Sequence, residues 1–251
     1  MEQIKYEVTE NETFYFYVRL VISIAIYAGL GYTFFAHGVS KLGDILIFYA
    51  ILILLYFFFS FGLLVGYIEG NAIKVTKKQF PDVYSIIESH CEKLGMATVP
   101  ATYIMQSGGV LNAFATRFIG RDFVVIYSEI FELAYAQGQD ALEFVIGHEL
   151  GHVKRKHMSK HVLLFPSLII PFLGSAYSRA CEYTCDNIGK ALNANGGKDG
   201  LLILAAGKEL YKKVNMEEYI NEERNEDSFW KWFSEKTSSH PNLPKRIDRM
   251  K

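Results

Sequence analysis

Cysteine is scarce in this chain, and positive charge is not in excess. Three cysteines in 251 residues are too few, and odd in number, for a disulfide framework. Such usage suits a reducing compartment. Lys and Arg number 26 against 27 Asp and Glu, so the formal net charge is −1. Because no basic stripe is present to neutralise phosphates, we expect no nucleic-acid partner.

Two long stretches near the N-terminus almost lack charge. Residues 15–35 contain only Arg19, which we expect to extend toward the lipid headgroups, and residues 45–67 contain no charged residue. Each stretch is close to the ~20 residues that a helix needs to cross ~30 Å of hydrocarbon. We therefore predict a two-helix anchor within residues 1–70, embedded in the lipid bilayer, and a second domain over residues 71–251.

The distribution of lysines predicts the orientation of this anchor. Lys74, Lys77 and Lys78 directly follow the second stretch, whereas the short connection between the stretches has only Lys41. Because basic residues remain on the cytoplasmic side, both termini are expected in the cytoplasm. An acidic segment that includes Glu12 precedes the first stretch, which argues against a cleavable signal peptide. The expected location is the cell (inner) membrane.

Apolar spacing predicts a mostly helical domain with a small sheet. Helices are expected over residues 80–94, 129–136, from 140 onward, 178–192 and 200–214. Three β-rich runs at 102–106, 112–118 and 123–127 are interpreted as an antiparallel meander. Asp140 and Glu143 have capping-box spacing. The tail contains four aromatic residues that we expect in the core or a wall: Phe229, Trp230, Trp232 and Phe233.

The segment His148-Glu149-Leu150-Gly151-His152 is the strongest indication of chemistry. Two histidines four positions apart share one face of a helix, so both imidazoles can bind the same metal ion. Glu149 lies beside that face, where its carboxylate can accept a proton from a water molecule. This combination is typical of a zinc hydrolase, which also needs a third protein ligand.

The third ligand has to come from elsewhere in the chain. A histidine six positions after the second would serve, but Met158 stands there; His157 is off register, and His161 lies too far along the same helix. Glu182 is the candidate, and Asp186 shares its helix face, so one can bind metal while the other hydrogen-bonds an imidazole. An exposed acidic helix face is the alternative.

Cys181 and Cys185 have helical spacing in the same segment and could in principle bind metal. We expect them, with Cys91, to be buried small apolar residues, since no second cysteine pair lies nearby. Residues 162–177 form an apolar interval interrupted by Pro166 and Pro171. The interval is too short for a further membrane span, and we interpret it as a hairpin against the membrane surface or over the cleft, in preference to a simple core segment.

Over roughly residues 73–249 the chain resembles the membrane zinc peptidases that include HtpX-type proteases and CAAX prenyl proteases. Four separated motifs support the resemblance: Asn112-Ala113-Phe114-Ala115, His148 to His152, Ser178-Arg179 with Glu182 and Asp186, and Ser239-His240-Pro241 with Arg246. It implies an α+β fold: a mostly helical zincin-like domain of the gluzincin type, with a small antiparallel sheet, after an N-terminal transmembrane hairpin. HtpX-type members have further spans between the metal helix and the third ligand, which this chain is too short to contain.

The resemblance implies a zinc endopeptidase that acts on unfolded, misfolded or membrane polypeptides, with one Zn²⁺ per chain. The expected zinc ligands are His148, His152 and Glu182, with Glu149 as general base. His240 is expected to stabilise the developing oxyanion, and Arg246 to orient His240, to pair with a carboxylate or to lie in solvent. Substrate is expected to extend along residues 112–118.

Asn112, Ala113 and Phe114 are the proposed contacts on that strand, although Asn112 is also a typical turn residue. The rival hypothesis is a membrane-tethered binding or scaffold protein whose zinc is structural or vestigial. Glu149 favours the enzyme, because a structural zinc site has no need of a general base. The sequence leaves the oligomeric state open.

Overall fold

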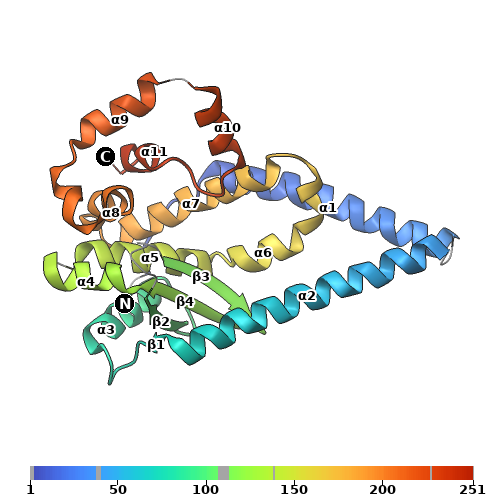
Figure 1. The fold of residues 1–251 in the computed structure, drawn as a ribbon, viewed down its shortest axis with the longest axis horizontal. Helices are drawn as coiled ribbons and strands as arrows, with labels where there is room; N and C mark the ends of the chain where they lie inside the picture. Colours follow the sequence, from blue (N-terminus) through green and yellow to red (C-terminus); the bar gives the residue numbers. More distant parts are fainter. Residues whose placement is uncertain (1–2, 38–40, 107–112, 138, 227, 251) are drawn as a thin grey trace.

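The computed structural model describes residues 3–37, 41–106, 113–137, 139–226 and 228–250 (Figure 1). The helices are α1 (Glu10–His37), α2 (Lys41–Asn71), α3 (Pro81–Lys93), α4 (Ser128–Gln137), α5 (Asp140–Lys154), α6 (His157–Leu163), α7 (Leu173–Leu192), α8 (Gly196–Leu210), α9 (Met216–Asn225), α10 (Phe229–Thr237) and α11 (Leu243–Asp248). Two 3-10 helices and four strands complete the described elements: η1 (Phe165–Ile169), η2 (Tyr211–Lys213), β1 (Ile73–Lys74), β2 (Ala101–Met105), β3 (Ala113–Phe118) and β4 (Arg121–Tyr127).

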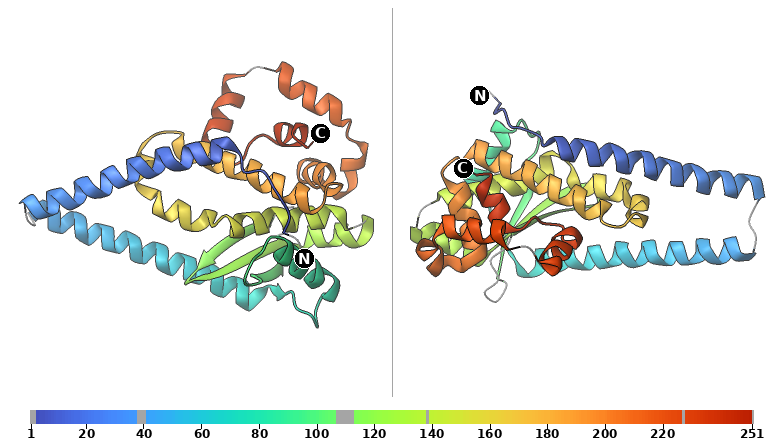
Figure 2. Two further views of the ribbon diagram at one scale, coloured as in Figure 1. Left: turned by 180° about the vertical axis from the view of Figure 1, so that it is seen from behind. Right: turned by 90° about the horizontal axis from the view of Figure 1, so that it is seen from above.

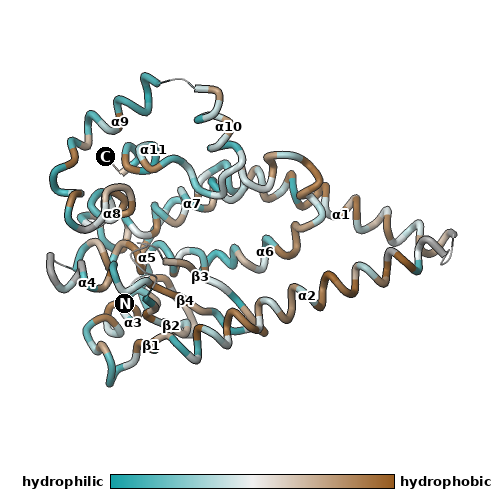
Figure 3. The backbone as a smooth tube through the Cα atoms, viewed as in Figure 1, coloured by the Kyte–Doolittle hydropathy of each residue, from teal (hydrophilic) through white to brown (hydrophobic). Residues whose placement is uncertain are grey.

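The first two helices are long and apolar enough to cross a membrane, as expected from their composition. They diverge from their connection, so that α1 runs along α7 and η1 while α2 leads to the sheet (Figures 1 and 2). Brown, hydrophobic colouring covers most of α2 in Figure 3. Most of its apolar side chains face outward, with Leu63 75% exposed, whereas Val65 and Ile68 near its end pack against the sheet. A surface of this kind is typical of a helix that hydrocarbon surrounds. The boundary near residue 70 stays a prediction.

Arg19 does not reach outward from α1, contrary to the expectation that it extends to the headgroups. Its side chain is fully buried. The guanidinium donates to Ser167 Oγ at 2.8 Å and to the Leu164 carbonyl at 3.0 Å, and it lies over the Tyr177 ring. A buried guanidinium needs such acceptors, and the apolar interval supplies them. Arg19 therefore joins α1 to the segment between α6 and α7.

The sheet is mixed, so the expected antiparallel meander is wrong. The strand order is β1-β2-β4-β3; β2 pairs with β4 in parallel, and β3 pairs with β4 in antiparallel fashion. β4 is therefore internal, and residues 123–126 are buried in succession. A continuous apolar run is typical of an internal strand, whereas a meander would have placed the half-exposed β3 at the centre. β3 instead forms an edge of the sheet.

Helix α5 lies beneath the sheet and packs against α7 and α8 (Figures 1 and 2). Its apolar side chains Leu142, Ile146 and Leu150 are buried in the main core. The capping box is not formed: Gln139 is the N-cap, and Asp140 is the first helical residue. The Asp140 and Glu143 carboxylates instead accept hydrogen bonds from Asn193 Nδ2, at 2.9 and 3.0 Å. They thereby join the start of α5 to the end of α7.

The aromatic residues of the tail helix α10, expected in the core or a wall, are exposed, so a place in the core is wrong. Trp230 is 73% exposed and Trp232 50%. The segment formed by α6 and η1, residues 157–169 (the α6–η1 segment), also exposes apolar side chains, since Ile169 is 74% exposed. Phe172, at the start of α7, lies edge-on to Phe233 of α10 with ring centroids 6.0 Å apart. The two exposed apolar segments are therefore neighbours.

Candidate metal centre

Glycines bring α5 and α7 unusually close together. A Cβ at Gly147 would lie 3.1 Å from Gly189 Cα, and one at Gly189 would lie 3.0 Å from the Phe144 carbonyl oxygen. A Cβ at Gly151 would lie 3.3 Å from Cys185 Cα. Gly147 and Gly151 each precede a histidine of the motif. Their lack of a side chain therefore sets the motif histidines directly against the carboxylates of α7.

The side chains of His148, His152 and Glu182 converge on one point. The two Nε2 atoms lie 3.3 Å apart; His148 Nε2 is 3.4 Å from Glu182 Oε2, and His152 Nε2 is 3.3 Å from Oε1. One ligand atom from each residue lies within 4.8 Å of the others. Glu182 is 5% exposed and points inward, so it does not form part of an exposed acidic face.

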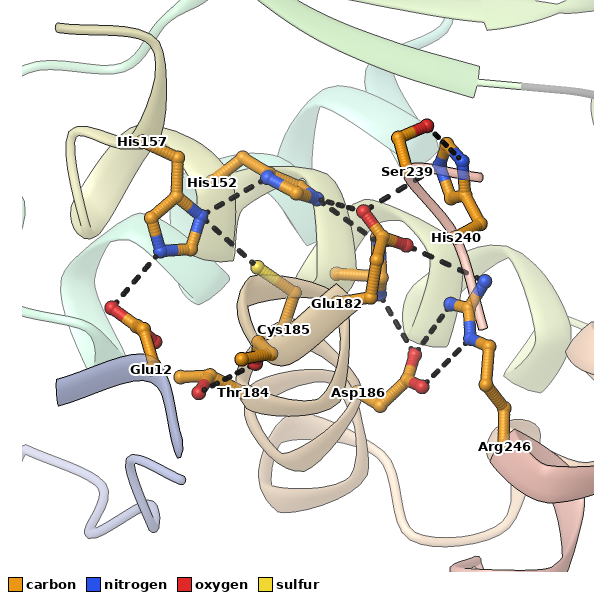
Figure 4. A network of polar contacts seen from close by, with 12 residues as sticks. Glu12, His152, His157, Glu182, Thr184, Cys185, Asp186, Ser239, His240 and Arg246 are labelled. Atoms are coloured by element: carbon orange, nitrogen blue, oxygen red, sulfur yellow. Dashed lines mark hydrogen bonds and ion pairs between the residues drawn. The ribbon is translucent and has the colours of Figure 1, made fainter. Parts of the chain in front are cut away.

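Arg246 lies beside Asp186 and Glu182 (Figure 4), and Asp186 contacts His148. Asp186 Oδ1 is 2.9 Å from His148 Nδ1, and Arg246 donates two hydrogen bonds to Asp186 at 2.7 and 2.8 Å. Arg246 is buried and its Nη1 also lies 3.4 Å from Glu182 Oε2. Of the three alternatives for Arg246, the structure therefore shows pairing with a carboxylate. Asp186 accepts a hydrogen bond from the N–H group at His148 Nδ1, so the Nε2 atom of His148 is the one that faces the convergence point.

Charges within this cluster favour a cation. Burial opposes the charged imidazole, but the Asp186 and Glu182 carboxylates raise the pKa of His148 to about 10. Burial likewise opposes ionisation of Glu182, yet His148 and His152 hold its pKa well below the usual range. The electrostatics at the point between the side chains therefore favour a positive charge, either a proton or a metal ion. Two imidazole nitrogens and a carboxylate oxygen are a donor set that fits zinc.

His157 supports His152, a role that sequence spacing did not reveal. Helix α5 ends at Lys154, and Lys156 adopts a left-handed conformation (φ 55°), so α6 starts in a new direction. The expectation that one helix continues through His157 and His161 is therefore wrong. His157 Nδ1 lies 3.1 Å from His152 Nδ1, and its Nε2 lies 3.2 Å from Glu12 Oε1. Burial lowers the pKa of His157 to about 4, despite the hydrogen bond to Glu12, so its ring is neutral.

A cavity of about 230 Å³ opens beside the convergence point, between α5 and strand β3. Glu149, 6% exposed, lines it together with His148 and His152. Ala113 and Phe114 line it from β3, and their expected contact with substrate stays a prediction, whereas Asn112 lies outside the described residues. A second cavity, of about 320 Å³, shares Glu149 and Glu182 and continues to apolar side chains: Ile130, Val145, Leu201, Leu204 and Leu243.

His240 reaches the mouth of both cavities. Its Nε2 lies 3.5 Å from Glu182 Oε1, and its side chain is 62% exposed. Ser239 Oγ is 2.9 Å from His240 Nδ1. Arg179 donates to the carbonyl oxygens of Glu235, Lys236 and Ser238, which holds the preceding backbone in place. Arg246 thus pairs with carboxylates, while Arg179 fixes the position of the His240 segment.

The cysteines are buried free thiols, as expected. Cys185 Sγ lies 3.7 Å from His157 Nδ1, and it forms a potential ligand group with His152 and His157. Burial raises the pKa of the Cys185 thiol well above its usual range, which opposes formation of a thiolate ligand. The better donor set is therefore the His148, His152 and Glu182 cluster.

Two imidazoles and a carboxylate around one point, with a further glutamate in the same cavity, define the kind of site found in metallopeptidases. The family model of Peptidase family M48 matches residues 77–170 and 161–251, more than half of the chain. The chain belongs to this family and is a metallopeptidase. The resemblance expected from the motifs is confirmed.

A solved structure shares the fold. The crystal structure of S. mikatae Ste24p superposes with a TM-score of 0.56 over 98% of this chain and 67% of that chain, at 16% sequence identity. At this identity the match shows a common fold, including the helices that precede the sheet. No curated protein matches the sequence.

Proposed function

We propose that the protein is a membrane-anchored zinc endopeptidase. The observation that supports this most directly is the convergence of ligand atoms from His148, His152 and Glu182 within 4.8 Å, next to a cavity that Glu149 lines. Asp186 would hold His148 in the tautomer that directs Nε2 at zinc. Bound zinc supplies Lewis-acid activation of water and of the scissile carbonyl group.

Glu149 acts as the general base in this proposal. Its carboxylate takes a proton from the attacking water molecule and then delivers it to the departing amine nitrogen. His240, at the cavity mouth, donates a hydrogen bond to the carbonyl oxygen as negative charge develops there. Its exposed side chain and its fixed backbone segment suit a group that meets an incoming substrate.

The substrate is proposed to be an unfolded, misfolded or membrane polypeptide. β3 is an edge strand that lines the cavity, so an extended peptide can pair with its backbone without a particular sequence. The apolar part of the second cavity offers space for one hydrophobic side chain beside the metal ligands. A folded protein could not present an extended backbone in this cleft.

The orientation of the anchor follows from charge. Lys74, Lys77 and Lys78 come after α2 at the entrance to the sheet, and we propose that they keep the catalytic region in the cytoplasm. The α6–η1 segment would then lie against the membrane surface, next to α1, to which Arg19 joins it.

Replacing Glu149 tests the proposal. In detergent-purified Glu149→Gln protein we expect one zinc per chain to remain bound, while casein cleavage falls about 10²–10⁴-fold, the usual range for loss of a general base. Metal content is measured by atomic absorption and cleavage by release of labelled peptides. Glu92→Gln, at an exposed position of α3, is the matched control and should cleave normally.

Two outcomes would contradict the enzyme assignment. Equal cleavage by wild type and the Glu149→Gln variant would assign the activity to a contaminant or to another base. A wild type that binds zinc but cleaves no unfolded polypeptide would favour the alternative, a membrane-tethered binding or scaffold protein.

A further inference from the structure

Glu12, in the first turn of α1, is buried among groups from a distant part of the sequence (Figure 4). Its side chain is 1% exposed, although most of α1 is apolar. Glu12 Oε1 accepts hydrogen bonds from Arg155 at 2.8 and 3.2 Å and lies 3.2 Å from His157 Nε2. Burying a carboxylate costs free energy, so we expect the buried Glu12 side chain to have a role in the folded protein.

The proton positions in this chain of contacts follow from simple valence. A neutral imidazole has one N–H group, and the partners of the His157 ring decide which of its nitrogens carries the proton. Its Nε2 faces the Glu12 carboxylate, which only accepts hydrogen bonds, so the proton lies on Nε2. His157 Nδ1 is then an acceptor, and the facing His152 Nδ1 has to donate to it. This leaves the lone pair of His152 on Nε2.

The lone pair so placed points at the convergence point. His152 Nε2 lies 3.3 Å from both His148 Nε2 and Glu182 Oε1. In the opposite tautomer of His157, the unprotonated Nε2 would face the Glu12 carboxylate, and the N–H group on Nδ1 would face His152 Nδ1. His152 would then lose the acceptor that keeps its proton away from the metal side.

The two metal-facing histidines are thus supported in parallel ways. Behind His148 stands Asp186, paired with Arg246. Behind His152 stands His157 and then Glu12, paired with Arg155. Both arrangements end in a buried carboxylate that an arginine neutralises. Only the second takes its carboxylate from a membrane helix.

We propose that Glu12 is a positioning residue for the metal centre, which acts through His157 to hold His152 in its metal-binding tautomer. This proposal rests on the ligand role proposed for His152. Its consequence is that the anchor helix α1 is part of the metal centre. Metal retention then depends on how α1 is seated against α6 and α7, and displacement of α1 from the domain weakens metal binding.

The test measures zinc affinity in the full-length protein in detergent micelles, by competition with a chromophoric chelator. Glu12→Gln keeps the shape of the side chain and removes its charge. Loss of a carboxylate behind a ligating histidine typically weakens metal binding about 10–100-fold, and we expect a rise in zinc Kd of that size. Glu10→Gln, at an exposed position of the same helix, should leave the zinc Kd unchanged.

A second variant and a double variant test the path of the effect. His157→Asn removes the ring that connects Glu12 to His152 and should also raise the zinc Kd at least tenfold. Because both substitutions break one chain, the double variant should bind zinc no more weakly than the worse single variant. The visible absorption spectrum of the cobalt-loaded protein should change in both single variants, since the geometry around His152 changes.

The outcomes separate this proposal from a purely structural role and from the proposed function. One outcome is that Glu12→Gln lowers the melting temperature of the metal-free protein but retains the wild-type zinc Kd and cobalt spectrum. In that case Glu12 only stabilises the fold, and the proposal is wrong. If the two single effects multiply in the double variant, the path through His157 is wrong. If Glu12→Gln does not fold, a wild-type zinc Kd in His157→Asn overturns the proposal. A wild type without zinc affinity would refute the proposed function itself.

Discussion

His148 holds a proton tightly in the metal-free protein, because two carboxylates face it inside the core. Its ordinary pKa near 6.5 rises to about 10, although burial alone would lower it. The charged ring therefore contributes stability that is fully present below pH 6.5 and is lost as the pH rises through about 10. A metal ion at Nε2 has to displace this proton, so metal binding and protonation compete at one atom.

This competition predicts a pH dependence of zinc binding. Between pH 7 and pH 9 the apparent zinc association constant should rise about tenfold per pH unit, since one proton leaves for each ion bound. Chelator competition at several pH values measures the slope. Calorimetry in two buffers of different ionisation enthalpy measures the proton released. A zinc affinity that does not change over this range would show that His148 is already neutral without metal.

At the scale of secondary-structure elements, the contact between α5 and α7 decides whether a metal centre forms. Gly147, Gly151 and Gly189 allow this contact, and Asn193 joins the helices at their far end. Sequence spacing predicted both helices and the face that each presents. It could not predict their separation, which depends on glycines more than 35 positions apart in the sequence.

Adding one methyl group at this contact should loosen the centre. In Gly189→Ala the new Cβ would meet the Phe144 carbonyl oxygen at 3.0 Å and the ring at 2.9 Å. Overpacking of this kind typically costs about 1–3 kcal/mol. We expect denaturant unfolding of the metal-free variant to show that loss, and its zinc Kd to rise as α7 shifts away from His148.

Gly66→Ala is the matched control for this substitution. Gly66 lies in α2, where an added Cβ meets nothing within 4 Å. It should have wild-type stability and zinc affinity. Equal zinc affinity in Gly189→Ala and wild type would contradict the view that close helix packing positions the ligands.

At the scale of the whole molecule, exposed apolar side chains of α1, of the segment between α6 and α7, and of α10 lie near one another. Helix α1, the α6–η1 segment and α10 are linked by Arg19 and by the contact between Phe172 and Phe233. Tryptophan side chains favour the boundary between headgroups and hydrocarbon. The aromatic residues of α10, misplaced in the core by composition alone, are therefore suited to lie at the membrane surface where α1 enters it.

Intrinsic fluorescence tests this placement, because Trp230 and Trp232 are the two tryptophans of the chain and both lie in α10. In vesicles made with lipids brominated near the headgroup end of the acyl chains, we expect strong quenching of the emission. Aqueous iodide should quench it only weakly. The reverse pattern would show that α10 projects into water, and replacement of both residues by Phe should abolish the signal in either case.

The sequence alone determined the local chemistry of this protein. Apolar stretches of sufficient length predicted α1 and α2, and the spacing of His148, Glu149 and His152 predicted the motif face, because helical periodicity links neighbours along the chain. The tertiary structure decided what periodicity does not encode: the parallel pairing of β2 with β4, the inward turn of Arg19 and the exposure of α10. It also brought Glu12 to His157 across 145 positions, since contacts between distant segments arise only when helices pack.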